Sequence, residues 1–104
     1  MSQFDVYVNP IARARAAYPF LLIMESDIAA GTSEHVVAPL VERSRLGIMP
    51  GHLAPGVKVQ DVEHVVLIPA LASMTRRDLR EPVCNLSKDR SAILAAVDFL
   101  FFGV

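Results

Sequence analysis

The sequence has few of the features that mark secreted, membrane or nucleic-acid-binding proteins. Its one cysteine, Cys84, cannot form an internal disulfide, which fits a reducing compartment. Its 11 acidic and 10 basic residues nearly cancel, giving a net charge of -1, so neither a nucleic-acid footprint nor a polybasic anchor is visible. Met1–Asp5 lacks signal-peptide character, and no apolar run approaches the ~20 residues of a membrane helix. We expect a soluble cytoplasmic protein without direct, sequence-specific nucleic-acid binding and without membrane contact.

The sequence is equally poor in motifs that bind metals or cofactors. His35, His52 and His64 lie far apart, and none has another ligand type at helical i, i+4 spacing. His64 follows two acidic residues and is interpreted as a surface side chain. Cys84 has apolar neighbours and no nearby histidine, which indicates a buried, inert thiol. We therefore expect no metal, no cofactor and no catalytic residue.

One charged segment leaves an enzymatic alternative open. Thr75-Arg76-Arg77-Asp78 combines a hydroxyl, two guanidinium groups and an acid, which together could cleave RNA by acid–base and electrostatic catalysis. A charge run of this kind is more often a solvated turn. Both interpretations stay open at this point.

What the sequence has in excess is apolar residues, at 53%, with a mean hydropathy of +0.41. A single domain over residues 1–104 has a large surface for its volume and cannot bury them all. Exposed apolar patches usually mark interfaces, so we expect a homodimer. The alternative is a monomer with an unusually apolar core.

The apolar patterns predict roughly five strands and one terminal helix. Phe4, Val6 and Val8 alternate with polar residues, which predicts an opening strand with one buried face. Pro39 would place the third strand at a sheet edge or give it a bulge. The other predicted strands are 18–24, 34–41, a short one around 57–59, and 62–68 continuing into 70–74 after a break at Pro69.

A helix is predicted from about residue 88 to the end of the chain. Ser87 is the expected N-cap, and Gly103 is placed where a helix-stopping glycine belongs. A stripe of apolar residues at helical spacing would pack inward: Ile93, Val97, Leu100, Phe101 and Val104. Phe102 is about 100° from Phe101 around the helix, near or beyond the edge of that stripe.

The resulting tail, Phe101-Phe102-Gly103-Val104, is interpreted as a contact surface for another protein. A helix usually ends in polar residues, with cations near its negative pole. This one ends in aromatic residues. The alternative is that all its phenylalanines pack into the domain and its dimer partner.

These residues resemble a known family, the CcdB toxins of plasmids and chromosomes. Over residues 70–104 the chain follows the family pattern without a gap, and the start of the chain fits as well. The matching residues are Gln3-Phe4, Val6-Tyr7, Tyr18, Ser26-Asp27-Ile28, Pro39-Leu40, Ala72, Ser73, Glu81, Val83, Leu86, Ser87, Ile93, Ala96, Phe101 and Gly103.

The resemblance implies a fold and a function. The expected fold is mainly β with a C-terminal α-helix, an SH3-like antiparallel barrel of the CcdB/MazF type assembled as a homodimer. The expected function is that of a toxin that binds the DNA gyrase A subunit and traps the gyrase–DNA cleavage complex. A disordered antitoxin of the CcdA type would neutralise it. The implied protein is not an enzyme.

The resemblance also implies site residues. Gyrase contact would fall on Phe102, Gly103, Val104, Asp98 and Ile28, with Phe101 before the tail. Three positions depart from the family: Phe102 replaces a tryptophan, Asp98 an asparagine, and Ala29 a second isoleucine. A phenylalanine keeps most of the apolar area of tryptophan but loses the larger ring and the N–H donor. These departures leave open a non-toxic relative that binds only antitoxin, and a MazF-like, metal-independent RNA endonuclease is a further alternative.

Overall fold

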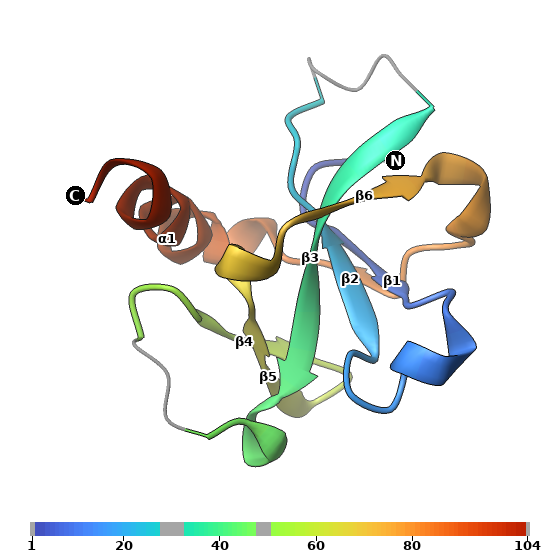
Figure 1. Ribbon diagram of the computed structural model, residues 1–104, viewed down its shortest axis with the longest axis horizontal. Helices are drawn as coiled ribbons and strands as arrows, with labels where there is room; N and C mark the ends of the chain where they lie inside the picture. Colours follow the sequence, from blue (N-terminus) through green and yellow to red (C-terminus); the bar gives the residue numbers. More distant parts are fainter. Residues whose placement is uncertain (1, 28–32, 48–50, 104) are drawn as a thin grey trace.

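The computed structural model describes residues 2–27, 33–47 and 51–103, which form seven strands and one α-helix (Figure 1). In chain order these are β1 (Asp5–Val8), β2 (Phe20–Ile23), β3 (Glu34–Glu42), β4 (Gly56–Val59), β5 (Val62–Val66), β6 (Ala72–Thr75), β7 (Cys84–Asn85) and α1 (Arg90–Phe102). Short 3₁₀ turns join several of them, among them η1 (Ala12–Ala14), η2 (Arg43–Arg45), η3 (Ile68–Ala70), η4 (Arg76–Asp78) and η5 (Ser87–Asp89).

The strands form one antiparallel sheet that curls into a nearly closed barrel. Its order is β4-β5-β3-β2-β1-β7, and β6 pairs with the first half of β3. This confirms the expected fold class, mainly β with a C-terminal helix. Two more strands are present than the sequence predicted. One of them, β7, has only two residues and offers no alternation to detect.

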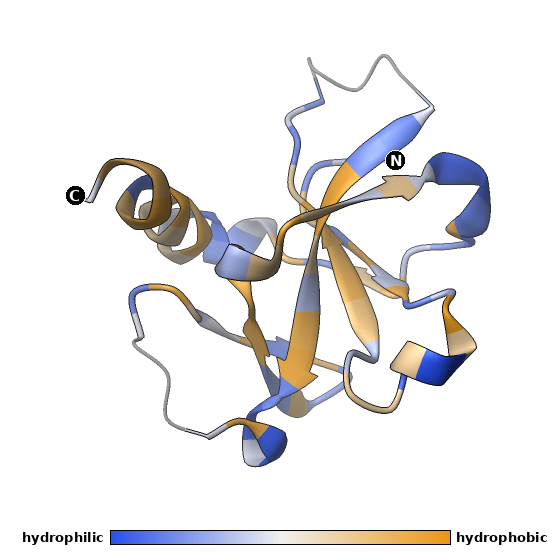
Figure 2. Cartoon of the chain, viewed as in Figure 1, coloured by the Kyte–Doolittle hydropathy of each residue, from blue (hydrophilic) through white to orange (hydrophobic). Residues whose placement is uncertain are grey.

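The barrel interior is filled by strand side chains and closed by the inner face of α1. Hydrophobic residues follow both the strands and the helix in Figure 2. The largest buried cluster joins both ends of the chain, since Phe4 and Val6 pack in the same core as Ile93 of α1. Its other buried members are Phe20, Leu22, Ala38, Leu40, Val57, Val59, Val66, Ile68, Leu86 and Ala96.

The prediction that β1 has one buried face was wrong. Val6 and Tyr7, which point to opposite faces, are both buried, whereas Val8 is 45% exposed. The reason is a second cluster on the other face of the sheet, where Tyr7 packs with Leu21 and Leu79. The connection between β6 and β7 supplies Leu79 and so covers a face that alternation alone marks as polar.

The predicted edge position of Pro39 was also wrong. Strand β3 is central, pairing with β2 on one side and with β6 and β5 on the other. Pro39 lies where the second partner changes, because β6 pairs as far as Val37 and β5 begins at Leu40. Its carbonyl accepts a hydrogen bond from the Leu67 N–H at 3.0 Å. A missing N–H is tolerated at this break between two ladders.

Helix α1 begins later than predicted. Ser87 opens the 3₁₀ turn η5, and Asp89 occupies the N-cap position without a side-chain capping hydrogen bond. At the other end Gly103 adopts φ 73°, and its N–H donates to the Phe99 carbonyl at 3.0 Å. The predicted glycine stop is therefore confirmed. Within the described residues no helix is long and apolar enough to cross a membrane.

Candidate functional site

Only the first half of α1 packs against the barrel. Ile93 and Ala96 are buried, and Leu94 and Val97 are partly buried against the main core. The helix packs on the 3₁₀ turn that contains Ile68. Figure 1 shows the C-terminal end of α1 projecting past the strands. The last turn of the helix therefore has little of its own chain to pack on.

Large apolar side chains in that last turn are exposed as a consequence. Phe99 and Leu100 are 38% and 37% exposed, Phe101 is 61% exposed, and Phe102 reaches 74%. Phe99 stacks obliquely on His52, with ring centroids 4.8 Å apart. Within the described residues, neither Phe101 nor Phe102 contacts another aromatic ring.

The sequence prediction for these two phenylalanines was half right. The exposure of Phe102, expected from its angle around the helix, is confirmed. Phe101 was expected to pack inward with Ile93, and in the single chain it does not. Helical spacing places Phe101 within about 80° of Ile93 around the helix axis, but the barrel does not extend far enough along α1 to cover Phe101.

Asp98 shares its side of the helix with both exposed rings. Successive helical residues turn by about 100°, so Asp98, Phe101 and Phe102 fit within an arc of about 100°. Asp98 is exposed, and no described residue forms an ion pair with it. Two apolar rings with one carboxylate beside them make a surface suited to a partner with an apolar pocket and a nearby donor.

The other predicted contact residues are described only in part. Ile28 and Val104 lie outside the described residues, as does Ala29. The segment before Ile28 is held by Gln3, whose N–H donates to the Asp27 carboxylate at 2.8 Å.

Gln3 links this segment to the start of α1, a role that the sequence reasoning missed. Its side-chain amide donates to the Met24 carbonyl at 3.0 Å and accepts from Arg90 at 3.2 Å. Arg90 also lies over the Phe4 ring, 5.9 Å from its centroid. Phe102 stands three turns further along α1, about 18 Å from Arg90 along the axis. The described contacts therefore tie Asp27 to the beginning of the helix and not to its exposed end.

Comparison with known proteins places this architecture in a family. The profile of the CcdB protein family matches residues 3–103 of the 104. The chain belongs to the CcdB family. Members of this family are the toxins of toxin–antitoxin systems, and the match includes Asp98, Phe101, Phe102 and Gly103. A search among curated proteins found no match.

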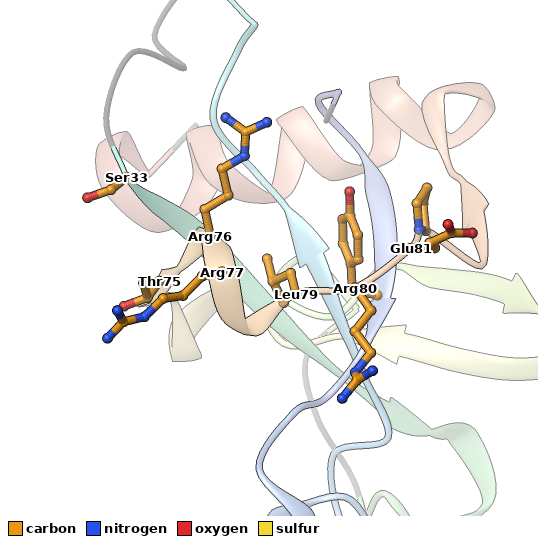
Figure 3. A pocket seen from close by; sticks show the side chains of 9 residues that line it. Ser33, Thr75, Arg76, Arg77, Leu79, Arg80 and Glu81 are labelled. Carbon is orange, nitrogen blue, oxygen red and sulfur yellow. The ribbon is translucent and has the colours of Figure 1, made fainter.

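A second feature of this CcdB-family chain is a groove beside the connection between β6 and β7. Its volume is about 930 Å³, and its lining includes Tyr7, Thr75, Leu79, Arg76, Arg77 and Arg80 (Figure 3). Tyr7 and Leu79 are buried in its floor, whereas the three arginines are exposed. Burial raises the pKa of the Tyr7 phenol, Asp5 adds to the rise, and Arg76 opposes it.

The arrangement of this groove bears on the RNA-cleavage alternative. Thr75 ends β6, and Arg76 and Arg77 follow in a 3₁₀ turn. In Figure 3 the guanidinium groups of Arg76 and Arg80 point in opposite directions, while that of Arg77 lies beside Thr75. The groups do not converge on one point, as stabilisation of a single reacting phosphate would require.

Two histidines are buried, which the sequence did not predict. His64 was interpreted as a surface residue, but only 2% of it is exposed. Its Nδ1 lies 2.9 Å from the Val62 carbonyl, and its ring packs edge-on against Phe20 with centroids 5.3 Å apart. His64 is buried because it lies two residues before Val66 on β5, and its side chain therefore points to the same face of the sheet, which faces the main core.

His35 is buried on the opposite face of the sheet. Its Nδ1 lies 2.6 Å from a carboxylate oxygen of Glu25, whose other oxygen accepts the Val36 N–H. Its Nε2 is buried and has no hydrogen-bond partner among the residues that the structure describes. The pair fixes Glu25 two residues before Asp27, and thus helps to hold the start of the segment that leads to Ile28.

Cys84 is partly buried on β7. Burial is the main cause that raises the pKa of its thiol, with Lys88 opposing and Asp5 reinforcing the rise. A raised pKa leaves little thiolate at neutral pH, so nucleophilic reactivity is low. Across the described residues, no group of three or more His, Cys, Asp and Glu side chains is placed to hold a metal ion.

Proposed function

We propose that this CcdB-family chain is a toxin that binds the DNA gyrase A subunit and traps the gyrase–DNA cleavage complex. The contact residues would be Phe102, Gly103, Val104 and Asp98, with Phe101 beside them and Ile28 contributing from the 26–28 segment. One observation supports this best: Phe101 and Phe102 are exposed by 61% and 74% at the end of an otherwise well-packed helix.

The exposed rings have the character of interface anchors. Leaving apolar surface in water costs about 25 cal/mol per Å², so rings without cover in the free chain favour association with a partner. The αL cap at Gly103 fixes the last turn and therefore the direction of Phe102. In this proposal the chain acts by binding alone and has no catalytic residue.

The acting form in this proposal is a homodimer. Leu100 lies seven residues after the buried Ile93 and on nearly the same helical face, yet it is 37% exposed. A second chain placed against this part of α1 would cover Leu100 and leave Phe101 and Phe102 accessible to gyrase. The two 26–28 segments and the two helix ends could then contribute to one gyrase-binding surface.

A CcdA-type antitoxin would neutralise the dimer by wrapping it and removing it from gyrase. The substitutions at Phe102, Asp98 and Ala29 support a second candidate, a relative that retains antitoxin binding but not toxicity. Phenylalanine is a weaker anchor than tryptophan, by about 1 kcal/mol or roughly fivefold in affinity. Controlled expression in a gyrase-sensitive host separates the two candidates: growth arrest indicates the toxin, and normal growth with soluble, folded protein indicates the non-toxic relative.

The decisive experiment deletes Phe102-Gly103-Val104. Purified full-length protein should increase the linear DNA released from gyrase and supercoiled plasmid after detergent and protease treatment. The deletion should abolish that increase while the thermal unfolding transition is retained, because these residues contribute no buried side chain to the described core. A deletion variant that still traps cleaved DNA would contradict the proposed contact. Incubation of the intact protein with messenger RNA in EDTA should give no cleavage, whereas cleavage would favour the endonuclease alternative.

A further inference from the structure

The last turn of α1 is linked to the barrel by a ring contact between Phe99 and His52. The two ring centroids are 4.8 Å apart, and the ring planes are inclined by 32°. This separation is in the range at which a pair of rings attracts beyond the burial of its area. His52 belongs to the segment that precedes β4, and Figure 1 shows this segment curving toward α1.

The segment that carries this histidine is itself attached to the barrel. The Leu53 carbonyl accepts a hydrogen bond from the Ile68 N–H at 3.3 Å. The Pro55 carbonyl accepts one from the Val66 N–H at 3.0 Å. Between them, Ala54 is 5% exposed and packs in a small core cluster. The imidazole is therefore held by backbone that has a fixed place on the sheet.

Behind the two rings, the segment and the helix are separated by a gap of about 410 Å³. On the helix side the gap is lined by Ala92, Ala95, Ala96 and Phe99. On the other side glycine and proline residues accompany His52. Small side chains of this kind cannot span such a gap. The two rings are the large side chains in its lining, and they bridge it.

Phe99 is also the residue from which the exposed end of the helix continues. Its carbonyl accepts the Gly103 N–H at 3.0 Å, the hydrogen bond that closes the helix. Phe102 follows three residues later, about 60° around the axis and about 4.5 Å along it. A restraint on the Phe99 side chain is therefore passed to the turn that carries Phe102.

We propose that His52 is a positioning residue for the gyrase contact. Stacked on Phe99, it fixes the direction of the last turn of α1 and so the direction in which Phe101 and Phe102 are presented. His52 does not touch gyrase in this proposal and acts only through Phe99. The inference rests on the proposed function and adds to it a residue from outside the helix.

Replacement of His52 tests the proposal directly. His52→Ala should weaken binding to a purified gyrase A subunit about fivefold in calorimetric titration, because the last turn is then free to take other directions. His52→Phe should restore the parent affinity, since it keeps a ring against Phe99 and removes both imidazole nitrogens. Rescue by a ring without polar atoms separates stacking from a direct hydrogen bond between His52 and gyrase.

A double-mutant cycle tests whether the effect passes through Phe99. Phe99→Leu keeps an apolar side chain but offers no ring, so it should weaken binding by a similar factor. His52→Ala should then cause no further loss in the Phe99→Leu background, because the contact is already absent. The matched control is Lys58→Ala, an exposed residue on β4 that does not line the gap, and it should leave the affinity unchanged.

NMR spectroscopy gives a measurement that does not depend on gyrase. The Gly103 amide should exchange with solvent about threefold faster or more in His52→Ala and at the parent rate in His52→Phe. The ring protons of His52 should resonate upfield in the parent, and this shift should disappear in Phe99→Leu. The thermal unfolding transition should be the same in all these variants, since His52 is exposed and lies outside the main core.

Three outcomes would overturn the proposal: parent affinity or parent amide exchange in His52→Ala, no rescue by His52→Phe, or additive losses in the double variant. A parent protein that does not bind the gyrase A subunit would instead refute the proposed function. The exchange measurement would still decide whether His52 holds the last turn, so the two failures are distinguishable.

Discussion

At the scale of single residues, Phe101 and Phe102 differ from Phe99, another aromatic residue near the end of α1, in their contacts with the rest of the chain. Phe99, three residues before Phe102, has a ring partner in His52, whereas the two later rings have none among the described residues. Because Phe102 is 74% exposed, the chain itself covers little of this residue, and only a partner could bury the rest. A change at this position should therefore alter binding and leave stability almost unchanged.

Phe102→Trp should strengthen gyrase binding about fivefold, and Phe102→Ala should weaken it by about 2 kcal/mol, or roughly thirtyfold. The first change restores the larger ring and its N–H donor, and the second removes the anchor. Calorimetric titration of the purified protein against a purified gyrase A subunit measures both. The control is Val62→Ala, an exposed apolar residue on the β4–β5 hairpin, which should change neither affinity nor stability. Equal affinities for the Phe102 variants would remove this residue from the contact.

At the scale of elements, α1 is divided into a packed half and a presenting half. Ile93 and Ala96 attach the first half to the core, and the αL cap at Gly103 terminates the second. The cap matters because the last turn has few tertiary contacts to keep it helical. A residue with a Cβ adopts the left-handed conformation at a cost of roughly 1–2 kcal/mol.

Gly103→Ala should loosen the last turn without destabilising the domain. The amide that donates to the Phe99 carbonyl should exchange with solvent about fivefold faster or more, while the global free energy of unfolding changes by less than about 0.5 kcal/mol. Hydrogen exchange followed by NMR measures the first quantity, and denaturant unfolding the second. Gly47→Ala is the matched control, since Gly47 is exposed and neither glycine has an atom within 4 Å of an added Cβ. Unchanged exchange in the last turn of the Gly103→Ala variant would show that the cap does not hold it.

At the scale of the whole molecule, two surfaces of different chemistry lie on different sides of one barrel. The end of α1 is apolar with one carboxylate, whereas the groove beside the β6–β7 connection is lined by three arginines and Glu81 over an apolar floor. Besides the helix end, the large hydrophobic residues exposed in the described part of the chain are Val8, Ile11, Tyr18, Val36 and Val62. This distribution favours an assembly in which part of the surface is covered by a second copy.

Leu100→Glu should shift the protein from dimer to monomer. In the proposed dimer, a charge at position 100 would be buried against the second chain without a partner, which is among the most costly changes at an interface. Sedimentation velocity over a range of concentrations measures the shift. Val62→Glu introduces the same charge on the β4–β5 hairpin and should leave the dimer intact. A monomeric parent protein, or a Leu100→Glu variant that stays dimeric, would contradict the proposed interface.

The sequence by itself determined the local features of this protein. Helical spacing and Gly103 defined α1 and its end, and the exposure of Phe102 followed from its angle around the helix. Only the tertiary structure decided that Phe101 is exposed, that His64 is buried and that Pro39 is central in the sheet. The physical reason is that periodicity shows which residues share a face, whereas burial depends on whether another element reaches that face.

The same distinction applies to the two surfaces. The order of residues along α1 was enough to single out its aromatic end, because all the relevant side chains lie on one element. The groove beside the β6–β7 connection combines Tyr7, which lies on β1, with Arg76 and Arg80, which follow β6. Residues about 70 positions apart come together there only through the strand order of the barrel. The sequence could show the charged segment, and the fold alone supplied its apolar floor.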